Sequence, residues 1–157
     1  MCSSDLVVGI AGAGGLGSNA AIALARAGVG RLIIADFDTI EPSNLNRQQY
    51  SVRQIGLRKA RALCANIKNI NPFCSCAAHD IRVTPSNTER IFGKADILIE
   101  AFDKAEEKSM LIRTWLSLRP RRPVIAASGL AGYGDNRGLH TRKIGRLYIC
   151  GDESSRC

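Results

Sequence analysis

Cysteine pairs at metal-binding spacing are missing from this sequence. A zinc ribbon needs C-x-x-C pairs, and none occurs among the 157 residues. This absence excludes a zinc ribbon, so we expect no structural zinc. The spacing indicates no disulfide framework either, so we expect reduced thiols, with Cys74 and Cys76 packed in the core. The six cysteines are Cys2, Cys64, Cys74, Cys76, Cys150 and Cys157.

Long apolar runs are missing as well. The longest runs, Val7–Ala13 and Ala20–Ala25, are interrupted by Gly or Arg well before the length that spans a bilayer. The segment Met1–Leu6 has neither a basic start nor an apolar signal core. We therefore expect a cytoplasmic location and no membrane association.

Aromatic residues are scarce, at 5% of the chain, whereas the net charge is +8. A basic chain suits a nucleic-acid partner or an acidic protein partner. The densest basic run, Arg119–Pro123, contains no aromatic residue on which a base could stack. We interpret this run as a solvated loop and do not expect a nucleic-acid partner.

Apolar runs alternate with segments of helical period from Val7 to Ser128. This alternation predicts one α/β domain over residues 1–157, with a Rossmann-like, doubly wound, mostly parallel sheet and helices on both faces. The predicted strands are Val7–Ala11, Leu32–Ala35, Cys74–His79, Ala95–Phe102 and Val124–Ser128. The predicted helices are Leu16–Ala27, Gly56–Ile70, Ser86–Phe92 and Lys104–Leu118.

The composition of the sequence changes from Gly129 onward. Glycines become frequent, and Arg146–Ile149 alternates polar with apolar residues. This pattern predicts a C-terminal antiparallel hairpin. The sequence shows no closing helix after it, and we expect the domain to be truncated at its C-terminus.

A glycine-rich turn follows the first predicted strand. Gly12-Ala13-Gly14-Gly15-Leu16-Gly17 fits G-x-G-x-x-G between a strand and a helix, where backbone amides can hold phosphate. Asp36, at the end of the second strand, lies where an acid accepts a ribose hydroxyl. These features also fit an NAD-dependent oxidoreductase, and glycines in a turn can simply allow close packing of helix and strand.

Three charged residues separate these interpretations. Adenylyl transfer builds up negative charge on phosphate, which fixed cations must offset, whereas hydride transfer has no such need. Arg47 can form two parallel hydrogen bonds with phosphate oxygens and Lys59 can supply a point charge. Asp103, after the strand that ends at Phe102, can hold Mg²⁺ against phosphates. Alone, Arg47 or Lys59 could be a solvated charge, and Asp103 could cap the next helix.

Taken together, these motifs resemble the ThiF, MoeB and HesA family, relatives of ubiquitin-activating enzymes. The resemblance rests on the order G-A-G-G-L-G-S-N, D-F-D, S-N-L-N-R-Q, G-x-x-K and a later strand-end Asp, and it covers about residues 7–152. It implies an ATP- and Mg²⁺-dependent adenylyltransferase that activates the terminal glycine carboxylate of a ubiquitin-like sulfur carrier protein. The segments Asn44–Gln48 and Ala101–Asp103 look closest to the thiamine-pathway members.

The resemblance also implies a role for each matched residue. Arg47, Lys59 and Asp103 would be catalytic, with Asp103 on magnesium. The nucleotide contacts would be Gly12, Gly14, Gly15, Gly17, Asp36, Asp38, Asn44, Arg47, Gln48 and Lys59.

The chain also departs from the family pattern. Many relatives have paired cysteines that bind zinc, and a crossover loop that holds the tail of the carrier protein. This sequence lacks both features. Relatives commonly work as homodimers, and we expect a homodimer here too. In those dimers the partner's N-terminal region commonly supplies a second arginine. Met1–Leu6 contains no arginine. A related tRNA-modifying dehydratase, which also activates a carboxylate with ATP, is the alternative within the family.

Overall fold

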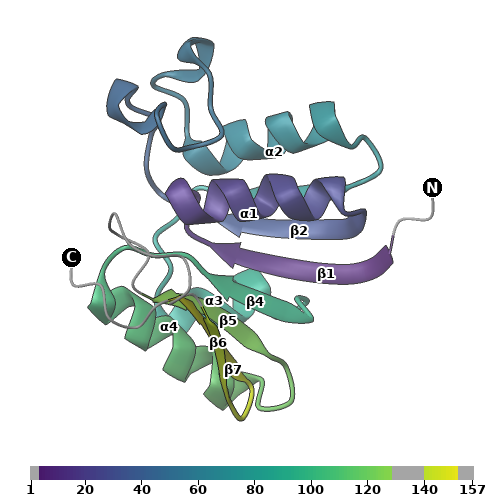
Figure 1. The fold of residues 1–157 in the computed structure, drawn as a ribbon, viewed down its shortest axis with the longest axis vertical. Coiled ribbons are helices and arrows are strands. Elements are labelled where there is room, and N and C mark those ends of the chain that lie inside the picture. The colour runs from purple at the N-terminus through teal and green to yellow at the C-terminus, as the bar shows by residue number, and fades with distance from the viewer. Residues whose placement is uncertain (1–3, 129–139, 152–157) are drawn as a thin grey trace.

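The computed structural model describes residues 4–128 and 140–151 of the chain. Strands and helices alternate up to residue 128, and a hairpin follows (Figure 1). The strands are β1 (Ser4–Ala11), β2 (Val29–Ala35), β3 (Ser75–His79), β4 (Ile97–Glu100), β5 (Val124–Ser128), β6 (His140–Ile144) and β7 (Leu147–Gly151). The helices are α1 (Gly15–Arg26), α2 (Lys59–Ile70), α3 (Pro85–Phe92) and α4 (Ala105–Leu118), with 3-10 turns η1 (Pro42–Asn44) and η2 (Val52–Gln54).

The strands form one seven-stranded sheet in the order β3-β2-β1-β4-β5-β7-β6. All pairs are parallel except β6 with β7, which are antiparallel. The chain moves outward from β1 through β2 to β3, and then returns to β4 on the other side of β1. Because the strand order reverses between β1 and β4, a crevice opens there at the carboxyl ends of the strands, which is where ligands bind in such sheets.

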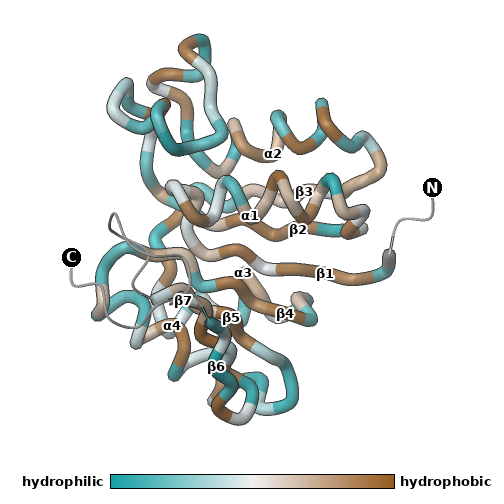
Figure 2. The backbone as a smooth tube through the Cα atoms, viewed as in Figure 1, coloured by the Kyte–Doolittle hydropathy of each residue, from teal (hydrophilic) through white to brown (hydrophobic). Residues whose placement is uncertain are grey.

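Both faces of the sheet are covered, so the central strands read as continuous apolar runs. In β2, Leu32 and Ile34 belong to the core cluster that includes Leu63 of α2. The intervening Ile33 belongs to the opposite cluster, which includes Trp115 of α4. Figure 1 shows α1 and α2 on one side of the sheet and α3 and α4 on the other, and Figure 2 shows the apolar residues gathered along the strands between them.

The predicted fold class is confirmed, including the C-terminal hairpin, although element ends differ. The helix expected from Gly56 begins only at Lys59, because Gly56 has a φ of +84°, outside the helical region. The 129–139 part of the glycine-rich segment lies outside the described residues. Within the described residues, no helix is both long and apolar enough to cross a bilayer.

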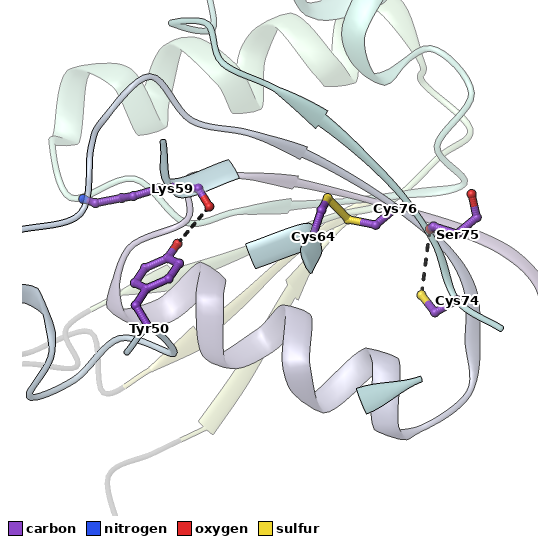
Figure 3. Close-up of a disulfide and its surroundings, with 6 residues drawn as sticks. All are labelled: Tyr50, Lys59, Cys64, Cys74, Ser75 and Cys76. Carbon is purple, nitrogen blue, oxygen red and sulfur yellow. Dashed lines mark hydrogen bonds between the residues drawn. A yellow bond between two sulfur atoms is a disulfide. The ribbon is translucent and has the colours of Figure 1, made fainter. Parts of the chain in front are cut away.

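The expectation that the thiols are reduced is wrong for one pair of cysteines. Cys64 of α2 and Cys76 of β3 form a disulfide (Figure 3). The packing of α2 against β3, not a short sequence motif, brings the two sulfurs together, so spacing gave no sign of the bond. Cys74 is a buried free thiol, as expected, whereas Cys2 and Cys157 lie outside the described residues.

The interpretation of Arg119–Pro123 as a solvated loop is also wrong in part. The guanidinium of Arg119 donates to the carbonyl oxygen of Gly93 at 3.1 Å, and that of Arg122 donates to the same oxygen at 3.1 Å. Arg119 also pairs with Glu89 of α3. Cations stabilise the carbonyl end of a helix, so this segment fixes the end of α3.

Candidate functional site

A cavity of about 800 Å³ lies at the carboxyl ends of the parallel strands, where the strand order reverses. It is lined from both sides of this reversal, by the loops after β1, β2 and β3 on one side and by the segment after β4 and the last residues of β5 on the other. The structure brings together all but one of the residues that the sequence predicts for the site, and Gly17 is the exception. Those that line the cavity are Gly12, Gly14, Gly15, Asp36, Asp38, Asn44, Arg47, Gln48, Lys59 and Asp103.

The glycines of the turn have two different roles. Gly12 has a φ of +98°, and a Cβ there would lie 2.7 Å from the carbonyl oxygen of Ala101. A Cβ on Gly17 would lie 1.9 Å from the carbonyl oxygen of Gly12. These two glycines therefore permit close packing. Around Gly14 and Gly15 the nearest atoms would be 4.0 and 3.7 Å away, so these two leave room for a ligand beside the backbone.

Asp36 links the end of β2 to the glycine turn. Its Oδ2 accepts the N–H of Ala13 at 2.6 Å and its Oδ1 accepts the N–H of Asp38 at 2.7 Å. Burial raises the pKa of Asp36, and the two backbone hydrogen bonds oppose that rise. Each carboxylate oxygen has a second lone pair, so Asp36 can hold the turn and still accept a ribose hydroxyl.

Lys59 is held at the cavity wall by Asp38. The Lys59 side chain is 8% exposed, and its Nζ lies 3.1 Å from Oδ2 of Asp38, whose side chain is 49% exposed. The N–H of Lys59 also donates to the carbonyl oxygen of Asp38 at 3.0 Å. A phosphate entering the cavity meets a fixed cation with a carboxylate partner beside it, so binding requires the ammonium to share or exchange that partner.

The loop that carries Arg47 is built on η1. The buried Asn44 closes η1 by accepting the N–H of Glu41 on its Oδ1 at 3.0 Å. The exposed Arg47 donates from Nη1 to the carbonyl oxygen of Ser43 at 3.0 Å. Its aliphatic part lies beside Gly15, where a Cβ would be 3.7 Å from Cγ and Cδ of Arg47. The stem of Arg47 thus packs beside the glycine turn, while its Nη1 also donates to Oδ1 of Asn46 at 3.1 Å within the loop.

Two polar residues of α1 clamp this loop. Nδ2 of Asn19 donates to the carbonyl oxygens of Gly15 at 2.5 Å and Arg47 at 3.0 Å. Oδ1 of Asn19 accepts from Nε2 of Gln49 at 2.6 Å, and Oγ of the buried Ser18 accepts the N–H of Gln49 at 3.2 Å. The S-N of the glycine motif therefore positions the loop, which sequence reasoning did not assign.

Gln48 is buried on the cavity wall, at 7% exposure. Its Oε1 has no hydrogen-bond partner within the described part of the chain. A buried acceptor without a partner is costly, so a ligand hydroxyl or ammonium reaching this oxygen would gain a hydrogen bond that the protein leaves open.

Tyr50 is a site residue that sequence reasoning missed. Its hydroxyl donates to the carbonyl oxygen of Ala13 at 2.7 Å and lies 3.4 Å from that of Lys59 (Figure 3). Burial, and secondarily the charge of Asp36, raises the pKa of Tyr50. The ring thus ties the glycine turn to the start of α2. A tyrosine two residues after Gln48 in an otherwise polar loop was the signal that could have identified it.

Asp103 reaches the cavity from the other side of the strand reversal. It lies between β4 and α4, exposed, and lines the cavity. The expected alternative, a helix cap, does not apply, because the N-cap of α4 is Lys104 and no side chain caps that end. The preceding Glu100 is fully buried and pairs with Lys108 at 2.6 Å. Burial raises the pKa of Glu100, and Lys108 opposes that rise.

Arg82 connects two walls of the cavity. Its Cζ lies 4.2 Å from the ring centroid of Phe37 after β2, and its Nη1 donates to Oε1 of Glu107 of α4 at 2.6 Å. All three residues line the cavity. Phe37 offers a flat apolar surface suited to a base or another planar group.

The described residues contain no group of three or more His, Cys, Asp or Glu side chains arranged to hold a metal ion. A metal at this site would therefore need oxygens that a ligand brings, in addition to a carboxylate of the cavity wall such as Asp103.

Known proteins are similar to this chain in both sequence and fold. The adenylyltransferase and sulfurtransferase uba4 of Pyricularia oryzae is 32% identical over 149 residues, which are 94% of this chain and 30% of that protein. The tRNA threonylcarbamoyladenosine dehydratase of Escherichia coli is 34% identical over 134 residues, 84% of this chain and 49% of that protein. The chain thus spans half or less of the length of these relatives.

Crystal structures of the same E. coli dehydratase are similar to this fold. Its ATP complex has a TM-score of 0.84 at 26% identity, over 96% of this chain and 74% of that one. Its AMP complex has a TM-score of 0.80 at 32% identity, over 88% and 56% of the two chains. The sequence profile of the ThiF family matches residues 4–156. The resemblance seen in the sequence is confirmed, and this protein belongs to the ThiF family.

Proposed function

We propose that this chain is the ATP-binding domain of an adenylyltransferase that activates a carboxylate with release of pyrophosphate. One observation carries the proposal: Arg47, Lys59 and Asp103, from three separate segments, line the same cavity as the glycine turn. The ATP and AMP complexes of the similar E. coli dehydratase support a nucleotide in this cavity.

The reaction forms one bond and breaks another at the α-phosphorus of ATP. An oxygen of the acceptor carboxylate bonds to phosphorus, and the bond to the oxygen bridging to the β-phosphate breaks, giving an acyl adenylate and pyrophosphate. Arg47 and Lys59 offset the negative charge that develops on the phosphates. Open space beside Gly14 and Gly15 lets the backbone approach them, and Asp36 would hold the ribose.

Asp103 fits the role of a magnesium ligand. Mg²⁺ in nucleotide sites is held by one or two carboxylates together with substrate phosphates, and Asp103 offers one exposed carboxylate at the cavity edge. When bound, the ion would neutralise phosphate charge opposite Lys59. In this proposal Asp103 is its protein ligand.

The acceptor we propose is the C-terminal glycine of a small ubiquitin-like sulfur carrier protein of the thiamine-pathway type. The uba4 relative is an adenylyltransferase and sulfurtransferase, which supports an acceptor that later takes up sulfur. We also propose that the protein works as a homodimer in the cytoplasm, where ATP is available. Sedimentation of the full protein tests the dimer, since a monomer at all concentrations would contradict it.

Pyrophosphate exchange with the full-length protein and its cognate carrier tests the reaction. We expect Arg47→Ala and Lys59→Ala each to lower exchange by about 100-fold or more, since each removes a charge that stabilises the transition state. Arg53→Ala is the matched control, because Arg53 is exposed on η2 and outside the cavity lining. Unchanged exchange in either cavity variant would overturn the proposal.

An oxidoreductase that uses NAD is the alternative from another enzyme class. The glycine turn and Asp36 suit it, but hydride transfer gives no role to Arg47, Lys59 and Asp103 together. Titration of nicotinamide fluorescence separates the two, because we expect NADH to bind far more weakly than ATP with Mg²⁺.

A tRNA-modifying dehydratase is the second candidate, favoured by the 34% identity to the E. coli dehydratase and by the net charge of +8. Here the carboxylate would belong to a modified nucleoside of RNA. A gel-shift assay with tRNA at rising salt distinguishes the acceptors, because binding through phosphates weakens steeply with salt. Absence of any shift at low salt would leave the carrier protein as the acceptor.

A further inference from the structure

Glu100 is a charged residue in the interior of the protein. It is the last residue of β4, between β1 and β5, and it has no exposed surface. A buried carboxylate is strongly disfavoured unless hydrogen bonds and an opposite charge compensate it. The residues that compensate Glu100 therefore show what the carboxylate does.

The two carboxylate oxygens of Glu100 accept hydrogen bonds from the two ends of the segment 102–108. Oε1 accepts the N–H of Phe102 at 2.7 Å, and Oε2 accepts from Nζ of Lys108 at 2.6 Å. Lys108 lies in the first turns of α4, with its side chain 26% exposed at the cavity. We call the Glu100–Lys108 pair the brace. It joins the end of β4 to α4, and Asp103 lies in the segment that the brace closes.

The peptide held by the brace touches the glycine turn. The N–H of Ala101 donates to the carbonyl oxygen of Ala11 at 2.9 Å. The Ala101 carbonyl oxygen leaves no space for a Cβ on Gly12, which would lie 2.7 Å from it. Displacement of residues 101 and 102 would thus move Asp103 and crowd the turn together.

We infer that the Glu100–Lys108 brace is a positioning device that holds Asp103 toward the phosphates and so sets the affinity for magnesium-bound ATP. The inference rests on the proposed function, since it assumes that Asp103 is a magnesium ligand. Residues that orient a metal ligand typically change metal affinity by about 10- to 100-fold when removed. The buried Glu100 acts through the Phe102 amide and Lys108, so the carboxylate itself does not need to touch the ligand.

Calorimetric titration of ATP into the full protein, with and without Mg²⁺, tests this inference. We expect Lys108→Met to reduce the affinity gained from Mg²⁺ by about tenfold, in addition to any loss of affinity for ATP alone, since Lys108 lines the cavity. Lys108→Arg should restore the gain, because Arg also pairs with a carboxylate. Arg113→Met is the control, since Arg113 is exposed on α4 and outside the cavity lining.

Two results for Lys108→Met would overturn the inference. One is an equal loss of ATP affinity with and without Mg²⁺, and the other is a wild-type increase in ATP affinity when Mg²⁺ is added. If Lys108→Met fails to fold because Glu100 is left unpaired, the double variant Glu100→Gln with Lys108→Met removes the buried charge, and the same outcomes apply. In that variant the Gln oxygen can still accept the Phe102 amide.

Amide exchange of Phe102, followed by NMR without nucleotide, separates this inference from the proposed function. We expect the Phe102 N–H to exchange about tenfold faster in Glu100→Ala, because it loses its acceptor. If pyrophosphate exchange is absent from wild type while Phe102 is protected and the magnesium gain depends on Lys108, adenylyl transfer is wrong and the brace stands. Unprotected Phe102 in wild type would sink the brace whatever the reaction.

Discussion

The two halves of the cavity are held in different ways. The glycine-turn half, made by the loops after β1 and β2 and the start of α2, is fixed by tight backbone contacts, the Asn19 clamp and a disulfide behind α2. The β4–α4 half, made by residues 100–108, is held by two ion pairs, Glu100–Lys108 within the segment and Arg82–Glu107 to the loop after β3. Many contacts hold the first half and few hold the second. We therefore expect changes in the first half to lower the stability of the domain, and loss of the ion pair in the second half to act mainly on the affinity for magnesium-bound ATP.

Gly17→Ala should cause the largest loss of stability, and it tests how the glycine-turn half is held. A methyl group there would meet the carbonyl oxygen of Gly12 at 1.9 Å, and we expect a loss of about 4 kcal/mol or more in the free energy of unfolding. Gly15→Ala is the matched control, since its methyl would be 3.7 Å from the nearest atoms. Chemical denaturation measures both. Equal stability of the two variants would show that close packing does not hold the glycine-turn half.

The disulfide gives the next largest effect. Cys64 and Cys76 are 12 residues apart, and a loop of that length gives about 3 kcal/mol in the chain-entropy treatment. We expect reductant to lower the stability of wild type by about 2 to 3 kcal/mol and to leave Cys64→Ser unchanged. Disulfides are rare in cytosolic proteins. The denaturation curves should therefore be accompanied by alkylation of free thiols at cell lysis, which shows whether Cys64 and Cys76 are bonded in the cell. A wild type indifferent to reductant would contradict this account.

Sequence patterns identified the residues that line the cavity better than those that hold them in place. The glycines, Arg47, Lys59 and Asp103 stand out in combination, because together they match a family pattern, although each alone has an ordinary structural explanation. Asn19 and Lys108 look ordinary in the sequence, because their roles depend on partners 28 and 8 residues away that only the fold brings near. Glu100 was not singled out from the sequence, although an acid inside an apolar strand requires a buried partner.

A smaller effect should follow from Asn19→Ala, which removes the clamp from the Arg47 loop. It loses hydrogen bonds to Gly15, Arg47 and Gln49, all near the surface, so we expect about 1 to 2 kcal/mol of stability to be lost. Pyrophosphate exchange should fall by about tenfold, since a small misplacement of a catalytic group is costly. Asn69→Ala, at an exposed position of α2, should change neither quantity.

The smallest effect concerns the protonation of Asp36. Burial raises its pKa above the ordinary value of 3.8, so Asp36 takes up a proton in the folded state at a pH where the unfolded chain is still ionised. Its contribution to stability is therefore complete below about pH 3.8 and is lost as the pH rises through the raised pKa. ATP affinity should change in the opposite direction, declining as the pH falls toward that pKa.

Comparison with Asp36→Asn isolates this carboxyl from the titration of ATP itself. We expect the variant to bind ATP more weakly at neutral pH, and the ratio of wild-type to variant affinity to fall as the pH is lowered from neutral toward the raised pKa of Asp36. A ratio independent of pH would show that the charge of Asp36 plays no part in binding.

The strand β6 has a consequence for how the protein behaves at high concentration. It is the last strand on its side of the sheet in the described chain, and its residues are all exposed. Such an edge can pair with the edge of another molecule and start aggregation, which charged side chains on the strand discourage. Arg142 and Lys143 place two cations in adjacent positions on β6, so like-charge repulsion keeps two such edges apart. Colloidal stability should therefore fall as salt screens these charges.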